Sequence, residues 1–311
     1  MNKRIALTGA TGFVGKHLLK ELLSQGHLIN ALTRRSQPPQ DNVNWIMGDL
    51  KNKPALKELV SGVDVIINVA GLVKANSKNK FLAANATAVS TLLEQINSNK
   101  KTPHFIQISS LSAREPQISD YAFSKYQGEE NLKNNSISLN WTMVRPPGIY
   151  GPEDTETLKI FKMLKWHLAL FPASRHNRVS WVHVSDLVKA ISLLIVNKKY
   201  FGKIINVDDG REDGYSHEEF MATASELLNI KPLKITIPKF ILKVIGHIND
   251  TVGRILGYSP MVSAKKVNEL CHSNWICDKK SSFKDDEYKT KFNLKDGLKQ
   301  TLDWYKSNEY I

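Results

Sequence analysis

Three glycines near the start of the chain constrain its fold more than any other feature. They lie in Gly9-Ala-Thr-Gly12-Phe-Val-Gly15, after an apolar run at residues 4–8 and before apolar side chains at helical spacing. The order is therefore strand, glycine turn and helix. Such a turn lets backbone amides at the positive end of a helix dipole approach a pyrophosphate closely. The residues predicted to line this dinucleotide site are Gly9, Thr11, Gly12, Phe13, Val14 and Gly15.

The end of the second predicted strand, residues 28–33, bears on the choice of dinucleotide. It is followed by Arg34 and Arg35 and by no acidic residue. An acidic residue at this place binds the ribose hydroxyl of NAD, whereas an arginine accommodates the extra phosphate of NADP. We therefore predict NADP, with NAD as the second choice. The alternative is that both arginines are ordinary solvated side chains.

Short apolar runs alternate with helical patterns over the first half of the chain. This alternation predicts a parallel sheet covered by helices on both faces. Ligands of such sheets bind at the carboxyl ends of the strands, where Asp49, Ala70 and Gly71 fall. A long helix is expected over residues 79–97. The further strands are predicted at residues 44–47, 63–69, 104–109 and 141–145.

The stretch Tyr121-Ala-Phe-Ser-Lys125 opens the next predicted helix and has a chemical use. Tyrosine and lysine four residues apart lie on one helical face. A tyrosine has a reference pKa of about 10, and a neighbouring ammonium group stabilises the phenolate and lowers that pKa. The preceding strand end offers the hydroxyls of Ser109, Ser110 and Ser112 to a substrate oxygen. The pattern therefore predicts proton transfer coupled to hydride transfer. A chance pairing in a lysine-rich chain is the alternative.

Charge and cysteine content exclude several other classes. The formal net charge is +13, but the lysines are spread along all 311 residues without interleaved aromatics, so we expect no nucleic-acid partner. Cys271 and Cys277 lack metal-ligand spacing, which indicates free thiols in a reducing compartment and no metal. No apolar run is long enough to span a bilayer. We therefore expect a cytoplasmic protein with a small-molecule substrate.

Taken together, the motifs resemble the short-chain dehydrogenase/reductase superfamily. The resemblance is to its extended branch of NAD-dependent epimerases and dehydratases, with dihydroflavonol-reductase-like and steroid-dehydrogenase-like members. It covers nearly the whole chain. The residues that carry it are Thr8-Gly-Ala-Thr-Gly-Phe-Val-Gly15, Gly48-Asp49-Leu50, Asn68-Val-Ala-Gly71, Asn85, Ile108-Ser-Ser110, Tyr121-x-x-x-Lys125, Arg145-Pro-Pro-Gly-Ile-Tyr-Gly-Pro152 and Val182-His-Val-x-Asp186.

The resemblance implies an α/β fold, a Rossmann-type doubly wound parallel sheet with a smaller, mainly helical C-terminal substrate-binding region. The dinucleotide-binding domain would be residues 1–150, completed by about 179–208. The substrate-binding region would then be about 151–178 and 209–311. In many relatives the helices that carry Asn85 and Tyr121 form a four-helix interface, so a homodimer is one expectation.

The resemblance also implies roles for single residues. Tyr121 is the acid-base residue, and Lys125 assists it and bonds the nicotinamide ribose. Ser110 is the best match to the substrate-positioning hydroxyl, with Ser112 as an open alternative. The remaining cofactor contacts implied are Asp49 with adenine, Leu50 beside it, Ala70 and Gly71 along the cofactor, and the backbone after Pro146 at the nicotinamide amide.

Two departures from the family's usual sequence bear on the substrate. Residues 111–120 lack the Val-Tyr-Gly typical of nucleotide-sugar enzymes, and Val179-Ser-Trp181 replaces the usual Arg-Asp-Phe, so both changes argue against a sugar nucleotide. Residues 153–178 are expected to form a helix and an aromatic loop, either as an apolar pocket wall or as ordinary packing. Residues 240–256 form a basic amphipathic helix that fits a membrane surface or a pocket cover. Its place in the variable region of the family favours the pocket.

Three functions fit these observations. The first is an NAD(P)-dependent oxidoreductase acting on a carbonyl or secondary alcohol, with Tyr121 as acid-base residue. The second is a nucleotide-sugar epimerase or dehydratase that keeps NAD tightly bound. The third is a non-catalytic nucleotide-binding accessory protein of a respiratory assembly. An intact set of Ser110, Tyr121 and Lys125 favours the first.

Overall fold

The fold comes from a computed structural model that describes residues 2–96, 102–135, 139–256 and 263–311. The chain forms two compact units. Unit 1 comprises Met1–Arg145 and Val188–Ile205. Unit 2 comprises Pro146–Leu187 and Asn206–Ile311. That unit 2 binds the substrate remains a prediction.

Unit 1 is built on a seven-stranded sheet with the strand order β11-β6-β5-β4-β1-β2-β3. Neighbours from β6 to β3 pair in parallel, as the predicted crossover units require. β2 and β3 lie on one side of β1, and β4, β5, β6 and β11 lie on its other side, so the predicted doubly wound sheet is confirmed. The strands are β1 (Arg4–Thr8), β2 (Leu28–Thr33), β3 (Val43–Met47), β4 (Val65–Asn68), β5 (His104–Ile108), β6 (Trp141–Arg145) and β11 (Lys203–Asn206).

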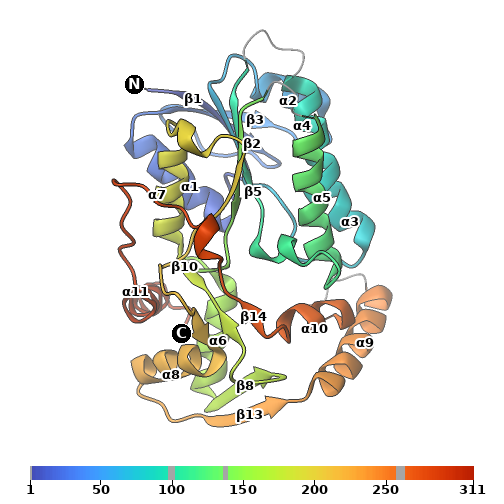
Figure 1. Cartoon of the computed structure of the whole chain (residues 1–311), viewed down its shortest axis with the longest axis vertical. Helices are drawn as coiled ribbons and strands as arrows, with labels where there is room; N and C mark the ends of the chain where they lie inside the picture. Colours follow the sequence, from blue (N-terminus) through green and yellow to red (C-terminus); the bar gives the residue numbers. More distant parts are fainter. Residues whose placement is uncertain (1, 97–101, 136–138, 257–262) are drawn as a thin grey trace. The chain divides into compact units, whose positions relative to one another are not determined.

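Helices cover both faces of this sheet (Figure 1). One core forms between the sheet and the helices α2, α4 and α5, where Leu56, Leu92 and Leu132 are fully buried against Phe105 and Met143. On the other face, Gln25 at the end of α1 bonds Ser192 of α7, with its side-chain nitrogen 3.0 Å from the hydroxyl. The helices are α1 (Phe13–Ser24), α2 (Lys53–Leu59), α3 (Lys78–Leu82), α4 (Ala88–Ile96), α5 (Asp120–Asn135) and α7 (Val184–Leu194).

The helix expected over residues 79–97 is interrupted. Its first turn is α3, a π-helical turn follows at Ala83–Thr87, and α4 ends at Ile96, beyond which residue 97 lies outside the described residues. Asn85 is buried inside the π turn. π turns widen a helix locally and are frequent at functional sites, so Asn85 is a candidate site residue.

Unit 2 combines short strand pairs with helices around a separate core. Phe161, Phe171 and Leu298 are fully buried there, together with Tyr305. Its strands are β7 (Gly148–Tyr150) with β10 (Trp181–His183), β8 (Leu168–Pro172) with β13 (Leu233–Ile237), and β12 (Tyr215–Ser216), β9 (Arg178–Val179) and β14 (Asn274–Trp275) in one sheet. Its helices are α6 (Thr155–Lys165), α8 (His217–Leu228), α9 (Lys239–Leu256), α10 (Ala264–Leu270) and α11 (Leu294–Ser307).

The aromatic loop expected after residue 166 is a strand instead. Residues of β8 alternate between half-buried and buried, and Phe171 packs in the core of unit 2. Phe161 and Leu164 of α6 are also fully buried in that core, so they act as packing residues. Trp166, between α6 and β8, is 80% exposed. The short period-two pattern of β8 was hidden by the helical spacing of the residues before it.

The helix α9 places large apolar side chains on the surface of unit 2. Its buried positions are Leu242, Gly246 and Gly253, and it packs on α10. The apolar residues of α9 that are exposed are Phe240, Ile241, Val244, Ile245, Ile248, Val252 and Leu256. Among the helices of the described residues, none combines the length and the apolar character needed to cross a bilayer.

Candidate active site

The glycine turn joins β1 to α1 as predicted, and its glycines are required by close backbone contacts. Gly9 has φ +72°, and a Cβ there would lie 2.8 Å from Ala70 N. A Cβ on Gly15 would lie 1.9 Å from the carbonyl oxygen of Gly9. Gly12 is the N-cap of α1, whose first amides are not capped by a side chain. The turn therefore presents backbone amides at the head of a helix, as an anionic phosphate needs.

A chain of buried hydrogen bonds crosses the ends of three neighbouring strands beside this turn. Thr8 Oγ1 donates to Asn68 Oδ1 over 2.5 Å and accepts from Ala70 N over 3.1 Å. Asn68 Nδ2 donates to Gln107 Oε1 over 2.8 Å, and Gln107 Nε2 donates to the carbonyl oxygen of Ile108. This polar chain fixes the backbone at Ala70 relative to the glycine turn.

The other predicted cofactor residues also follow strand ends. Arg34 and Arg35 come directly after β2, and both are exposed. Asp49 and Leu50 follow β3, where Asp49 Oδ1 accepts from Lys51 N over 2.8 Å. Pro146 follows β6. Because parallel strands end at one edge of a sheet, the strand ends of β1 to β6 share the edge where a dinucleotide binds.

The loop after β4 meets α5 through Asn85. A Cβ on Gly71 would lie 2.8 Å from Asn85 Oδ1 and 3.1 Å from Lys125 Nζ. Asn85 accepts from Leu72 N over 2.8 Å and donates to the hydroxyl of Ser124 over 2.9 Å. The π turn thus positions one amide side chain between the loop after β4 and α5.

The helix α5 approaches the π turn closely because it has a glycine there. A Cβ on Gly128 would lie 2.2 Å from the carbonyl oxygen of Asn85. The close approach of these two helices is therefore provided by the glycine of α5.

Tyr121 and the predicted serines lie around the start of α5. Ser119 caps this helix by accepting from Ala122 N over 3.0 Å, and Tyr121 follows in its first turn with its ring edge toward Phe81. Tyr121 is half-buried. Ser112 is buried and donates its hydroxyl hydrogen to Ser110 Oγ over 2.9 Å, whereas Ser110 is half-buried. Of these two serines, Ser110 is therefore the more accessible.

Lys125 is a buried cation one helical turn after Tyr121. Its Nζ donates to the carbonyl oxygen of Ile108 over 3.1 Å. Desolvation by burial lowers the pKa of Lys125 to about 8, although the negative charge of Glu129 acts in the opposite direction. The ammonium form is thus costly but present at neutral pH. A cation in so poorly solvated a place stabilises a nearby phenolate more strongly than one in water.

A buried ion pair behind Lys125 was not predicted from the sequence. Glu129 is fully buried and accepts two bonds from Arg145, from Nε over 2.8 Å and from Nη2 over 2.5 Å. Its Oε1 also accepts from the hydroxyl of Ser109 over 2.5 Å. This bidentate pair ties α5 to the ends of β5 and β6. The signal available in the sequence was Glu129 four residues after Lys125, on the same helical face.

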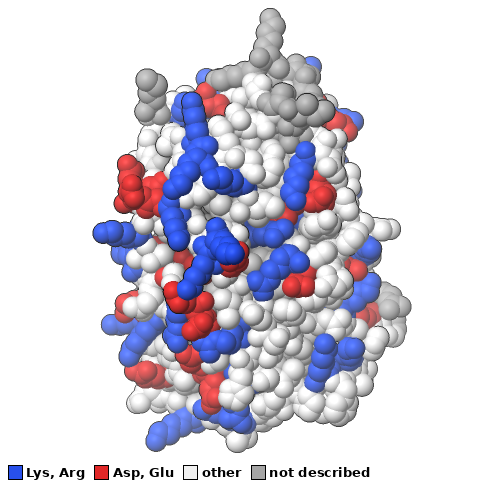
Figure 2. Space-filling model, viewed as in Figure 1, with Lys and Arg blue, Asp and Glu red and all other residues white. Residues whose placement is uncertain are grey.

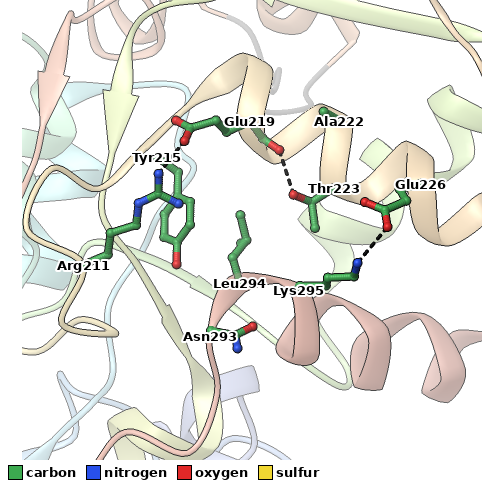
Figure 3. Close-up of a pocket in the computed structure, with 9 residues that line it drawn as sticks. All are labelled: Arg211, Tyr215, Glu219, Ala222, Thr223, Glu226, Asn293, Leu294 and Lys295. Carbon is green, nitrogen blue, oxygen red and sulfur yellow. Dashed lines mark hydrogen bonds and ion pairs between the residues drawn. The ribbon is translucent and has the colours of Figure 1, made fainter.

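A separate hollow of about 480 Å³ lies in unit 2 (Figure 3). Its charged groups pair with one another, Arg211 with Glu219 and Lys295 with Glu226, and the hydroxyl of Thr223 donates to the Glu219 backbone. None of the predicted site residues lines it. In the described part of the chain, no cluster of His, Cys, Asp or Glu could hold a metal ion.

Comparison with known proteins identifies the family of this chain. The model of the NAD dependent epimerase/dehydratase family matches residues 5–208. The chain belongs to this family. The predicted resemblance to the extended short-chain dehydrogenases is thereby confirmed, as is the prediction of an NAD(P)-dependent enzyme.

Individual members of the family differ in what they act on. A ceramide reductase of Caulobacter vibrioides is 34% identical over 99% of this chain and 96% of its own length. A 4-hydroxy-2-methyl-3-oxo-4-farnesyl-3,4-dihydroquinoline-1-oxide ketoreductase of Stigmatella aurantiaca is 24% identical over 81% of each chain. The structure of a UDP-glucuronic acid 4-epimerase from Bacillus cereus, in complex with UDP-glucuronic acid and NAD, has a TM-score of 0.73 at 17% identity, covering 98% of this chain and 99% of that one. The last likeness shows the fold alone.

The residues of unit 1 fit the nicotinamide dinucleotide that the family binds. The glycine turn accepts no Cβ at Gly9 or Gly15, and the first amides of α1 have no side-chain cap. At the other end of the predicted cofactor path, Gly71 leaves room beside Asn85 and the buried ammonium of Lys125. An anionic group at the turn and a polar ribose near Lys125 would each find donors there.

Proposed function

We propose that this chain is an NADP-dependent reductase that acts on the ketone group of a ceramide-like lipid. The observation that carries the proposal is the 34% identity with a ceramide reductase over nearly the full length of both chains. The second relative named above is also a ketoreductase, of a farnesylated substrate. Both names describe reduction of large, apolar molecules, and neither substrate is a nucleotide sugar.

In the proposed mechanism, Tyr121 supplies the proton, and a bound NADPH would supply the hydride that the carbonyl carbon accepts. The phenol of Tyr121 donates its proton to the carbonyl oxygen, which yields a secondary alcohol and leaves a phenolate. The ammonium of Lys125, one turn along α5, stabilises that phenolate. Ser110 holds the same carbonyl oxygen through its hydroxyl. The greater exposure of Ser110, compared with the buried Ser112, supports this assignment.

Two exposed arginines support NADP over NAD as the cofactor. Arg34 and Arg35 follow β2, the strand next to β1, at the place where dinucleotide folds meet the adenosine ribose. A guanidinium pairs well with a phosphate monoester, whereas an acidic residue would repel it. Asp49, after β3, is proposed to contact the adenine.

The test is reduction of a ceramide whose sphingoid-base hydroxyl has been oxidised to a ketone. In detergent, we expect loss of NADPH absorbance together with a product heavier by two hydrogens. Tyr121→Phe should lower turnover by at least about 10²-fold, the range of general acid catalysis, and leave the affinity for NADPH nearly unchanged. Tyr126→Phe, on the same helix, is the matched control and should keep full activity. Retained turnover in Tyr121→Phe would overturn the mechanism.

The epimerase alternative has a specific observation in its favour, because the fold is also that of a UDP-glucuronic acid 4-epimerase. An epimerase would release stoichiometric NAD when the purified protein is denatured, and it would interconvert sugar nucleotides without net oxidation. Neither is expected here. For the non-catalytic alternative, the expected signature is co-purification with a large assembly and no turnover in solution.

A further inference from the structure

Among the described residues, α9 has more exposed large apolar side chains than any other helix or strand, and the proposed function does not use them. Within α9, Phe240 and Leu256 are each 69% exposed, Ile248 is 57% exposed and Val244 is 56% exposed. The strand that leads into this helix, β13, adds the exposed side chains of Leu233 and Ile235. Large apolar side chains gathered this densely on a surface mark an interaction site.

The apolar side chains form one continuous stripe along α9. At about 100° per residue, Phe240, Val244 and Ile248 fall on one side of the stripe, and Leu256 falls on the other. Together with Ile241, Ile245 and Val252, they occupy less than half of the circumference. The packing face toward α10 is a different one, where a Cβ on Gly246 would lie 2.6 Å from Ala264 N. The stripe therefore lies beside the packed face and not within it.

Basic side chains border the stripe along its edge at Phe240 and Val244. Lys243 and His247 are exposed and lie between the stripe and the packed face. From residue 239 to residue 256 the chain contains three Lys or Arg residues and a single acid, Asp250. The carboxylate of Asp250 accepts from Ala264 N over 3.0 Å, so it serves the packing against α10. In Figure 2 the surface where Figure 1 places α9 is drawn mainly white and blue.

We propose that α9 docks unit 2 on a lipid membrane that carries anionic headgroups. A helix of this kind lies in the plane of the membrane interface, with its apolar face among the acyl chains and its basic side chains at the headgroups. Lysine stems extend along the apolar face while their ammonium groups stay in water. A second copy of the chain is a poorer partner, because a two-fold interface would bring the lysine borders of both copies together.

Docking of this kind extends the proposed function and does not depend on it. If the substrate is a ceramide-like lipid, it resides in a membrane, and a protein held at the interface meets it without extracting it across water. The inference itself rests on the exposure, the spacing and the charge of α9. It favours the membrane surface over the pocket cover expected from the sequence, which stays an untested prediction.

Vesicle flotation tests the proposal with the full-length protein, in the absence of cofactor and substrate. Wild-type protein should float with vesicles of phosphatidylcholine and phosphatidylglycerol, and binding should weaken with added salt. The variant Val244→Glu/Ile248→Glu should bind at least about tenfold more weakly, because two apolar side chains that would be buried in the membrane are lost. Val196→Glu, which changes a more exposed valine in unit 1, is the control and should float like wild type.

A second pair of variants separates charge from apolar burial. Lys239→Glu/Lys243→Glu should weaken binding to anionic vesicles by at least about fivefold for each lysine, and should have little effect on binding to pure phosphatidylcholine. Lys198→Glu/Lys280→Glu changes the net charge equally at exposed sites elsewhere and should keep most of the binding. All these variants change exposed side chains, and circular dichroism verifies that each is folded.

Three results would overturn membrane docking. They are wild-type protein that stays with the unbound fraction, α9 variants that float as well as wild type, or a concentration-dependent dimer that Val244→Glu/Ile248→Glu abolishes while vesicle binding persists. The proposed function fails separately. A chain that floats but does not reduce the ketone refutes the reductase alone, and a chain that reduces it but never floats refutes the docking alone.

Discussion

The buried ammonium of Lys125 leads to a prediction in which activity and stability change in opposite directions. Replacement by methionine keeps the length of the side chain and removes its charge. Lys125→Met should lose turnover, because the phenolate of Tyr121 is no longer stabilised. At pH 7 it should also be more stable than wild type, because burying the lysine cation costs free energy that an apolar side chain does not.

The magnitude follows from the pKa. Burial lowers the pKa of Lys125 from 10.5 to about 8, a shift worth about 3 kcal/mol at neutral pH. Loss of the hydrogen bond to Ile108 destabilises the variant by about 1 kcal/mol. The free energy of unfolding of Lys125→Met should therefore exceed that of wild type by about 2 kcal/mol. Since the folded-state pKa lies below the unfolded value, the cost is fully present below pH 8 and disappears as the pH rises through 10.5. At pH 10 the cost should have fallen to about 1 kcal/mol.

Urea denaturation from pH 7 to pH 10 measures both quantities. We expect a higher midpoint for Lys125→Met at pH 7 and convergence with wild type toward pH 10. Lys133→Met, an exposed lysine on the same helix, is the control and should change the free energy of unfolding by less than about 0.5 kcal/mol. A Lys125→Met protein that is less stable than wild type at pH 7, or whose advantage does not vary with pH, would refute the reasoning.

Three further predictions concern the rest of the site. Gly15→Ala would place a Cβ 1.9 Å from a backbone oxygen of the turn, so it should abolish the rise in melting temperature that NADPH produces. Arg34→Ala/Arg35→Ala should weaken NADPH binding at least about tenfold in calorimetry, through loss of charged hydrogen bonds, and leave NADH binding unchanged. Glu129→Gln leaves the guanidinium of Arg145 without its carboxylate, so the free energy of unfolding should fall by about 3 kcal/mol in urea titrations.

Each of these predictions has a control and a contrary result. Lys16→Ala changes the residue after the turn, and NADPH should still raise its melting temperature. If NADPH raised the melting temperature of Gly15→Ala equally, the close-contact argument would be contradicted. If Arg34→Ala/Arg35→Ala weakened the binding of NADPH and NADH equally, the arginines would not determine which cofactor is preferred. Glu130→Gln, one residue along α5 and more exposed, should be nearly neutral, and a neutral Glu129→Gln would show that the pair contributes little.

The parts of unit 1 that were predictable from the sequence are those with strong local patterns. The strand β4, residues Val65–Asn68, begins with three apolar residues and is soon followed by a glycine, Gly71, so it could be predicted as a buried strand. The π turn at Asn85 was not, because its residues, Ala83–Thr87, are small or polar and carry no apolar spacing that distinguishes a π turn from an α turn. The strand β8 was hidden by its length of five residues, which suits a strand or a helical turn equally.

The candidate site shows the same division. The glycine turn and the Tyr121–Lys125 pair are local motifs, so their placement could be inferred from spacing. The pairing of Glu129 with Arg145 joins residues 16 positions apart on a helix and a strand, and no local pattern encodes it. The exposure of α9 was also beyond the sequence, because amphipathic spacing gives the apolar face of a helix but not what covers that face.

The hydrogen bonds from Thr8 to Asn68 and from Asn68 to Gln107 have a consequence for how the sheet assembles. These residues are direct partners across β1, β4 and β5. Strands that are apolar on both faces distinguish poorly between alternative alignments, since a shifted strand still buries apolar side chains. A shift by one residue would turn these polar groups to opposite faces and leave them unpaired in the interior. Three uncharged side chains thus select one alignment of the central strands. That alignment places Ala70, in the loop after β4, against the glycine turn.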